Sequence, residues 1–130
     1  GMKPLLCVGE NAKERTEGKT ARKISMQINN AFKGLQAEQA KEVVVAYEPL
    51  WAIGSGQAAT AKDAQEVCHL IREKLTTMFG EKISRQVRIL YGGSVNENNA
   101  VAFKISGIDG VLVGGASLNA KAFSAIVRSF

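Results

Sequence analysis

Four short apolar segments of this 130-residue chain each end at a glycine or an acidic residue. The segments are rich in β-branched residues and show little polar alternation, which is typical of strands buried in a parallel sheet. In folds built on such sheets, ligands bind beyond the carboxyl ends of the strands. The candidate site residues therefore follow the segments: Gly9-Glu10 after 5–8, Glu48-Pro49 after 43–47, Gly92-Gly93-Ser94 after 87–91 and Gly114-Gly115 after 111–113.

Glu48 is the sharpest of these candidates, because a carboxylate directly after a run of valines gains nothing from packing. A carboxylate at the rim of a barrel, partly shielded from water by a closing loop, can act as a general base. The alternative is a rim glutamate that forms an ion pair with a lysine.

The segment after Glu48 has a rigid proline at one end, glycines at the other and apolar residues between, a composition that suits a lid over a site. The alternative is an ordinary loop whose Trp51 packs on the rim. We call this stretch the lid segment; it consists of Pro49, Leu50, Trp51, Ala52, Ile53, Gly54, Ser55 and Gly56.

The two glycine pairs indicate a site for an anion. Glycine lets backbone N–H groups approach a bound anion closely, and the loops after the last two strands of (β/α)8 barrels frequently bind phosphate. The Ser94 hydroxyl adds a further donor. Each pair alone is better explained as a tight turn, but two in succession in this topology favour phosphate binding.

Helical patterns occupy the gaps between the apolar segments and must position these loops. One stripe begins after Gly18 and ends near Gly34; its apolar positions are Ala21, Ile24, Ile28, Ala31, Phe32 and Leu35. Thr60 is expected to cap the next helix, with Asp63 as its capping-box partner and Gly80 at its end. Its apolar face is Ala64, Val67, Cys68, Ile71, Leu75 and Met78. Shorter helices are expected from near Asn96 through 100–105, and from about Asn119 through Phe123, Ile126 and Val127.

This alternation of strands and helices predicts an α/β fold with four parallel strands and right-handed crossovers, in one domain over residues 1–130. The length is about half of the ~250 residues that a complete (β/α)8 barrel needs. The one histidine, His69, lies mid-helix, and barrel helices form the outer ring, so we expect it on the surface or in helix packing.

Composition narrows the function classes. The net charge is +5, but the 17 Lys and Arg are scattered, so no clustered patch predicts nucleic-acid binding. Cys7 and Cys68 lie far apart without a CxxC motif, which favours a reducing, cytoplasmic compartment. No apolar run approaches 18 residues and no signal peptide is recognisable, so we expect no membrane association.

Four motifs, in this order and spacing, resemble those of the triosephosphate isomerase family from its fifth strand to its C-terminus. They are Leu6-Cys7-Val8-Gly9-Glu10, Ala46-Tyr47-Glu48-Pro49-Leu50-Trp51-Ala52-Ile53-Gly54, Leu90-Tyr91-Gly92-Gly93-Ser94-Val95-Asn96 and Asp109-Gly110-Val111-Leu112-Val113-Gly114-Gly115-Ala116-Ser117. The resemblance covers nearly the whole chain. It implies the C-terminal half of a TIM barrel.

The resemblance also implies roles. Glu48 resembles the base that moves a proton between adjacent carbons of dihydroxyacetone phosphate and glyceraldehyde 3-phosphate, through an enediol, in glycolysis and gluconeogenesis. Residues 49–58 resemble the lid, and Gly54, Ser94, Gly114 and Gly115 the phosphate-binding groups. Tyr91 and Ser94 resemble residues that latch the lid, Cys7 and Glu10 supporting residues, and Arg72 with Asp109 a structural ion pair. The family needs no metal and no organic cofactor.

Two departures from the family pattern matter. The end of the lid, usually close to Lys-Thr-Ala, is Gln57-Ala58-Ala59 here. The family's catalytic lysine and histidine, and its dimer loop, belong to the first four strands, which this chain lacks. We therefore expect a truncated chain that is inactive alone, that accepts an N-terminal half-barrel as partner and that self-associates through exposed sheet edges. The alternative is a non-catalytic, self-assembling half-barrel; an unrelated phosphate-binding barrel would not need the Glu-Pro-Leu-Trp lid.

Overall fold

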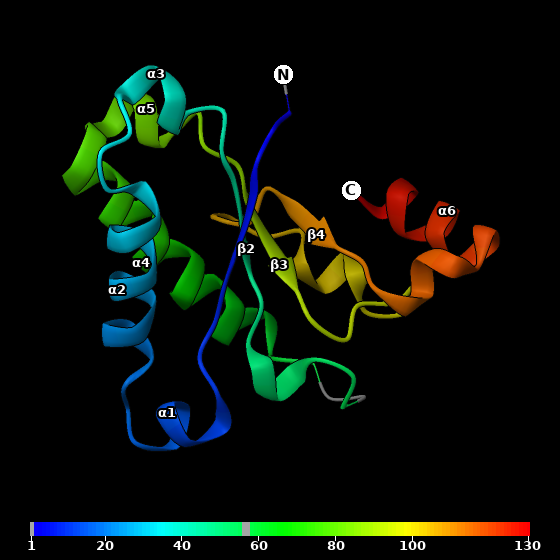
Figure 1. Ribbon diagram of the computed structural model, residues 1–130. Helices are drawn as coiled ribbons and strands as arrows, with labels where there is room; N and C mark the ends of the chain where they lie inside the picture. The colour runs from blue at the N-terminus through cyan, green and yellow to red at the C-terminus, as the bar shows by residue number, and fades with distance from the viewer. Residues whose placement is uncertain (1, 56–57) are drawn as a thin grey trace.

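The computed structural model describes residues 2–55 and 58–130, so Gly56 of the lid segment and Gln57 of its expected hinge lie outside the described residues. One parallel sheet forms the centre of the molecule (Figure 1). Its strands are β1 (Leu5–Val8), β2 (Val44–Tyr47), β3 (Ile89–Gly92) and β4 (Gly110–Leu112), in the order β1-β2-β3-β4. This is the predicted α/β architecture, four parallel strands alternating with helices as in half of a TIM barrel.

The register aligns the carboxyl ends of the strands. Val8 lies opposite Tyr47, Tyr47 opposite Tyr91, and Tyr91 opposite Val111. The loops that follow the strands therefore meet along one edge of the sheet, as the sequence predicts.

The helices differ greatly in length. The long ones are α2 (Thr20–Phe32), α4 (Ala61–Phe79) and α6 (Ala120–Ser129). Single-turn helices are α1 (Ala12–Thr16), α3 (Ala37–Ala40) and α5 (Glu81–Ser84), and 3-10 turns are η1 (Leu50–Ala52), η2 (Ala100–Phe103) and η3 (Gly115–Leu118).

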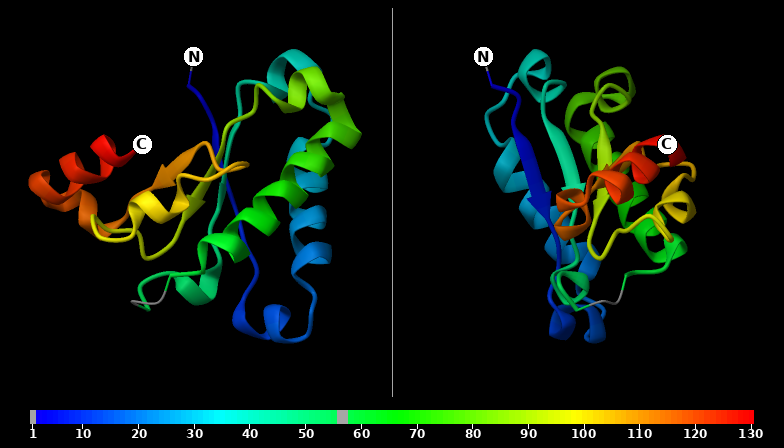
Figure 2. Two further views of the ribbon diagram at one scale, coloured as in Figure 1. Left: turned by 180° about the vertical axis from the view of Figure 1, so that it is seen from behind. Right: turned by 90° about the vertical axis from the view of Figure 1, so that its right-hand side faces the viewer.

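Helices α2 and α4 cover one face of the sheet, and the core lies between them and the strands (Figure 2). The sheet contributes the side chains that alternate toward the helices: Leu6, Val8, Val45, Tyr47, Ile89, Tyr91, Val111 and Val113. The helices contribute buried side chains at helical spacing, including Ile24, Ile28 and Phe32 of α2 and Ile71 and Leu75 of α4. A half-barrel can therefore build a core on its helix side.

In residues 2–55 and 58–130 no helix covers the opposite face of the sheet, and we call it the open face. Its side chains follow from the period of two along each strand: Leu5, Cys7, Val44, Ala46, Leu90 and Leu112, with Gly110 between them. Leu5 is 45% exposed and Cys7 is also exposed. Helix α6 packs on η2 and η3 beyond β4 (Figures 1 and 2), and its Val127 remains 59% exposed.

The structure corrects several sequence-based expectations. Strands β2 to β4 are shifted by one or two residues from the predicted ranges, and the helix expected near Asn96 is only the 3-10 turn Ala100–Phe103. Ala21 and Ala31 are exposed, because Ile24, Ile28 and Phe32 alone reach the core. In α6, Phe123 and Val127 are exposed and Ile126 is buried.

The predicted ends of α4, Thr60 and Gly80, are confirmed, but the Asp63 carboxylate bonds the Thr60 hydroxyl where a capping box would bond the Thr60 backbone N–H. The Thr60 hydroxyl accepts a hydrogen bond from the Asp63 backbone N–H at 3.1 Å, and the Asp63 carboxylate accepts one from that hydroxyl at 2.6 Å. Gly80 ends the helix with a φ of 80°, a conformation that favours glycine.

Candidate active site

Glu48 and the predicted phosphate-binding residues converge on one cavity at the carboxyl ends of β2, β3 and β4. Its volume is about 450 Å³, and we call it the site cavity. It is lined by Glu48, Ile53, Gly54, Gly93, Ser94, Val95, Asn96, Leu112, Gly114, Gly115 and Ala116. A carboxylate thus shares a small cavity with glycine-rich loops and a hydroxyl, a set of groups that suits proton transfer on a small anionic ligand.

The backbone of neighbouring strands fixes the position of Glu48. The Glu48 N–H donates to the Val8 carbonyl at 2.7 Å. A methyl group at Gly92 would lie 2.5 Å from Glu48 Cγ, and one at Gly9 would lie 1.8 Å from the Glu48 carbonyl oxygen. Both glycines are therefore required by close packing around the glutamate.

Glu48 does not behave as the alternative interpretation expects. Within residues 2–55 and 58–130, no lysine or arginine forms an ion pair with its carboxylate. Its close neighbour on the open face is Cys7, whose pKa is raised to about 11 by burial and then by the hydrogen bond and charge of Glu48. The thiol beside the carboxylate is therefore neutral at physiological pH.

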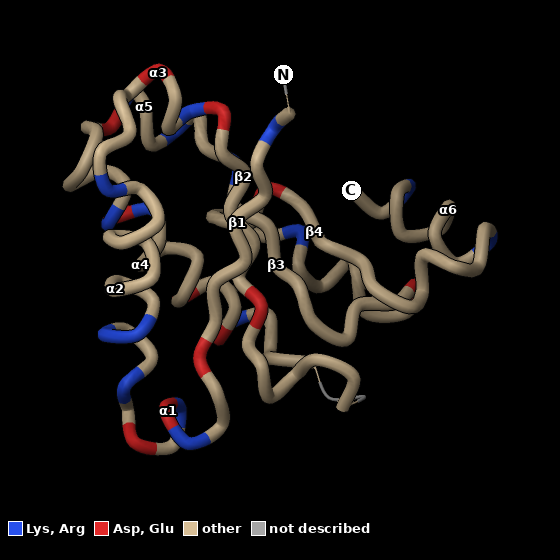
Figure 3. The backbone as a smooth tube through the Cα atoms, in the orientation of Figure 1, with Lys and Arg blue, Asp and Glu red and all other residues tan. Residues whose placement is uncertain are grey.

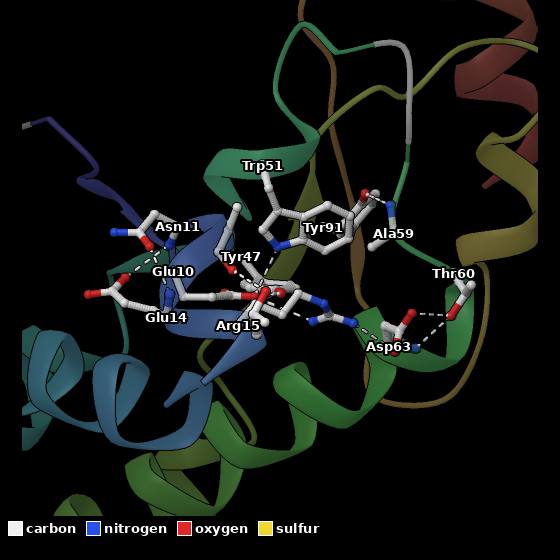
Figure 4. Close-up of polar contacts among 12 residues, drawn as sticks. Glu10, Asn11, Glu14, Arg15, Tyr47, Trp51, Ala59, Thr60, Asp63 and Tyr91 are labelled. Carbon is white, nitrogen blue, oxygen red and sulfur yellow. Dashed lines mark hydrogen bonds and ion pairs between the residues drawn. The ribbon is translucent and has the colours of Figure 1, made fainter. Parts of the chain in front are cut away.

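Glu10 lies outside the site cavity, in a buried cluster behind the lid segment (Figure 4). Its Oε1 accepts hydrogen bonds from the Tyr47 hydroxyl at 3.0 Å and from Trp51 Nε1 at 3.1 Å. Burial, and then the Glu10 charge, raise the pKa of Tyr47 well above its usual value, so the phenol remains a donor. Glu10 thus contacts the lid segment through Trp51 and does not line the site cavity.

The described part of the lid segment joins this cluster to the site cavity. Pro49 is buried and begins the turn η1, while Leu50 and Ile53 are about half exposed at 57% and 48%. Gly54 has a φ of 65° and lines the cavity, and Ser55 is exposed.

Ser94 after β3 and Tyr91 within β3 bind the chain in and beyond the lid segment. The Ser94 hydroxyl donates to the Ala52 carbonyl at 2.8 Å, and the Tyr91 hydroxyl accepts from the Ala59 N–H at 3.0 Å. Tyr91 is fully buried, and this burial raises its pKa. Ser94 thus contacts the lid segment itself, whereas the partner of Tyr91 lies just beyond residues 49–58.

Sequence reasoning missed two residues of the buried cluster. Tyr47 ends β2, and in the sequence it continues an apolar strand pattern. Its polar partner, Glu10, is visible only in the structure, where the Tyr47 hydroxyl donates to the Glu10 carboxylate. Arg15 contacts the nearby Glu10 and also Trp51 and Asp63, which are distant in sequence, and no local spacing indicates this set of partners.

Two further expectations concern residues outside the cavity. Arg72 Nη2 and Asp109 Oδ2 form the expected ion pair at 2.8 Å. His69 is exposed on α4, with its ring against Gly107, and does not line the site cavity.

A second hollow, of about 550 Å³, lies at the amino ends of the strands. It is lined by Lys3, Lys41, Glu42, Val43, Val44, Gln86 and Arg88. Because ligands of α/β folds bind at carboxyl ends, we assign function to the smaller site cavity.

The described residues were compared with three other kinds of site: a basic patch, a membrane-spanning helix and a metal site. Lys and Arg are spread over helices and loops, without a single basic stripe (Figure 3). In residues 2–55 and 58–130, no helix is both long and apolar enough to cross a bilayer, and no three His, Cys, Asp or Glu side chains gather as metal ligands.

Comparison with known proteins identifies the family. The model of the family described as triosephosphate isomerase matches residues 1–130. Triosephosphate isomerases of Acetivibrio thermocellus and Carboxydothermus hydrogenoformans are 49% and 50% identical over 129 residues, each covering 98% of this chain and 51% of the relative. That of Moorella thermoacetica is 52% identical over 126 residues, which are 96% of this chain and 50% of the relative. The chain thus spans about half the length of these relatives, and it belongs to the triosephosphate isomerase family.

Proposed function

We propose that this chain is the C-terminal half of a triosephosphate isomerase barrel, with Glu48 as the base that interconverts dihydroxyacetone phosphate and glyceraldehyde 3-phosphate. The observation that carries the proposal is the shared cavity of Glu48, Gly54, Ser94 and the Gly114-Gly115 pair. The carboxylate removes a proton from one carbon and returns it to the neighbouring carbon of the enediol. The loop N–H groups and the Ser94 hydroxyl bind the phosphate.

If Glu48 is the base of this reaction, we expect the isolated chain to have no isomerase activity. Proton abstraction beside a carbonyl also needs groups that stabilise the charge developing on oxygen. In the family these are a lysine and a histidine from the first four strands, and an N-terminal half-barrel that supplies them is the expected partner. The free thiols Cys7 and Cys68 support a cytoplasmic location, because disulfides are rare in reducing compartments.

Complementation tests this function. The N-terminal half of the Moorella thermoacetica isomerase is mixed with this chain, and complex formation and isomerase activity are measured together. We expect a 1:1 complex with activity, and no activity above background from this chain alone. The matched control is Glu48→Gln, which keeps the size of the side chain and should abolish the activity of the mixture. A 1:1 complex without activity, or equal activity from the Glu48→Gln mixture, would contradict the assignment.

A non-catalytic, self-assembling half-barrel is the second candidate function. The exposed apolar side chains of the open face, of η3 and of α6 favour it: Leu5 at 45%, Leu118 at 91%, Phe123 at 41% and Val127 at 59%. Apolar surface left in water is typical of interaction sites. Glu48→Gln distinguishes the two candidates: it should abolish the activity of a catalytic complex and should leave the assembly of a non-catalytic half-barrel unchanged.

A further inference from the structure

Arg15 of α1 contacts both Trp51, which lies within the lid segment, and Asp63, which follows that segment (Figure 4). Its guanidinium carbon lies 4.6 Å from the centre of the Trp51 ring. Its Nη2 lies 2.9 Å from Asp63 Oδ1, in the first turn of α4. One side chain from a third element therefore joins the lid segment to the start of α4.

The chemistry of arginine explains how a single residue makes these contacts. The guanidinium presents a flat face for an aromatic ring and a fork of N–H donors at its edge. Trp51 takes the face, while Asp63 and Glu10 take the edge, with Nη1 3.4 Å from Glu10 Oε1. A lysine has one point charge and could not stack on the ring while reaching both carboxylates.

Arg15 also compensates the charge of Glu10. Glu10 is 0% exposed, and its Oε2 has no hydrogen-bond partner among the described residues. Arg15 is the one basic side chain in residues 2–55 and 58–130 that forms an ion pair with it. A buried carboxylate is costly unless it is paired, so the Glu10 acceptor for Trp51 Nε1 depends on Arg15.

Trp51 in turn belongs to the turn that begins directly after Glu48-Pro49. The Leu50 N–H donates to the Glu10 carbonyl at 3.0 Å, and Ala52 accepts from Ser94. The indole is therefore attached to a turn whose backbone is held on both sides and continues directly from Glu48 and Pro49.

We propose that Arg15 is a positioning residue, which fixes the backbone of Glu48 by clamping Trp51 to Asp63 across the lid segment. Its effect on turnover rests on the isomerase function proposed above, but the clamp itself does not. Arg15 does not line the site cavity, so its loss should lower kcat and leave KM nearly unchanged.

The sequence offers a direct reporter of the clamp, because Trp51 is the one tryptophan of the chain. We would measure acrylamide quenching of Trp51 fluorescence in the wild type and in Arg15→Gln, Asp63→Asn and the double variant. Loss of the stacked guanidinium should raise the quenching constant about two-fold in Arg15→Gln. Asp63→Asn should raise it less, and should add nothing once Arg15 is replaced, because Asp63 acts through Arg15.

The matched control is Lys13→Gln, which removes a cation from the same helix, where Lys13 pairs only with Glu17 at 3.9 Å on the surface. Its quenching should equal that of the wild type. Far-UV circular dichroism separates a local change from unfolding, and Arg15→Lys tests the same point with the charge retained. Folded Arg15→Gln and Arg15→Lys variants whose quenching matches the wild type would overturn the clamp, as would additive effects of Arg15→Gln and Asp63→Asn.

The catalytic consequence is measured in the complex with the Moorella thermoacetica N-terminal half. Arg15→Gln should lower kcat about tenfold with KM within about two-fold, and Lys13→Gln should change neither. Unchanged kcat in Arg15→Gln would overturn the positioning role even where the fluorescence result stands. Absence of activity in the wild-type complex would count against the isomerase proposal instead, and the quenching experiment would still decide the clamp.

Discussion

At the scale of single residues, the position of Glu48 depends on two neighbouring glycines, Gly9 and Gly92, which have no side chain. Gly9 and Gly92 allow the strands on either side to approach the glutamate more closely than any larger residue would permit. In the proposed isomerase reaction the Glu48 carboxylate takes a proton from carbon. Close packing that fixes the carboxylate favours this step, because a small displacement of a reacting group lowers the rate.

Gly92→Ala tests the requirement for this close packing. The added methyl would lie 2.5 Å from Glu48 Cγ and 2.8 Å from Oε1, so the carboxylate must move. We expect about a hundredfold loss of kcat in the complemented barrel, measured by isomerase assay. The control is Gly110→Ala, where the methyl meets only the end of the Leu90 side chain at 3.1 Å. Equal activities of the two variants would argue against a packed Glu48.

Cys7 offers a second test at this scale, through its pKa of about 11. Because a raised pKa leaves less thiolate at neutral pH, Cys7 should react with iodoacetamide about tenfold more slowly than an ordinary exposed thiol. Removal of the neighbouring charge in Glu48→Gln should lower the pKa and accelerate the reaction. The measurement is the rate of alkylation against pH by mass spectrometry; a rate that does not respond to Glu48→Gln would refute the contact. Cys68, buried with a pKa of about 12, should stay unmodified until the chain unfolds.

The site residues that sequence alone predicts are those whose position follows from strand ends. Glu48, Ser94 and the glycine pairs follow apolar runs, and parallel strands bring such positions to one edge. Arg15 could not be predicted in this way, since its partners come from three separate loops and helices. Polar contacts of that kind depend on how elements pack, which periodicity does not record.

At the scale of elements, α4 is attached to the sheet by Arg72 as well as by its apolar face. Arg72 donates to the Ser84 and Val87 carbonyls, besides its ion pair with Asp109, and Asp109 accepts from the Ile89 N–H at 2.7 Å. The arginine therefore ties α4 to the segment that leads into β3 and to the loop before β4.

Replacement of Arg72 should therefore cost more than the loss of a surface ion pair. Arg72→Ala removes the charged donor shared by the Ser84 and Val87 carbonyls and the Asp109 carboxylate, and should lower the free energy of unfolding by about 2 to 3 kcal/mol, measured by urea denaturation. Arg85→Ala removes an exposed pair with Glu81, of 75% and 68% exposed side chains, and should cost less than about 0.5 kcal/mol. Similar losses in both variants would mean that Arg72 has only a surface role.

The elements that sequence reasoning missed are short. Helices α1, α3 and α5 are single turns, and a period of 3.6 residues cannot be recognised over so few positions. The start of α1 did carry a signal, because Asn11 and Glu14 form a capping box. The long helix α4 was predictable from both ends, since Thr60 and Gly80 cap it and its buried stripe is continuous.

At the scale of the whole molecule, the sheet has two free edges and an uncovered apolar face. Parallel strands are rarely stable with such a face in water, because their residues are apolar on both sides. The core on the helix side can therefore form in the isolated chain. The open face leaves apolar side chains in water, and its burial requires another chain.

We predict that the isolated chain self-associates, most simply as a two-fold pair that completes eight strands. Leu5→Lys puts a charge on the edge strand β1 and the open face, where Leu5 is 45% exposed, and should shift the chain toward monomer. The control is Val101→Lys, at a residue 60% exposed on η2, which should leave association unchanged. Light scattering on gel-filtered samples measures the mass. A wild-type monomer with hydrogen-exchange protection in all four strands would refute self-association.

The continuous core between the sheet and its two long helices has a consequence for protein engineering. Because that core is contained within one half, the seams of the half-barrel in the described residues are β1, β4, the open face and the exposed apolar side chains of η3 and α6. A half of this kind can be exchanged between homologues as a cassette, and its junction chemistry reduces to two strand edges and these apolar surfaces. Chimeric barrels should therefore tolerate divergence among the outer helices far better than a change of side-chain volume at Ala46, Leu90 or Leu112.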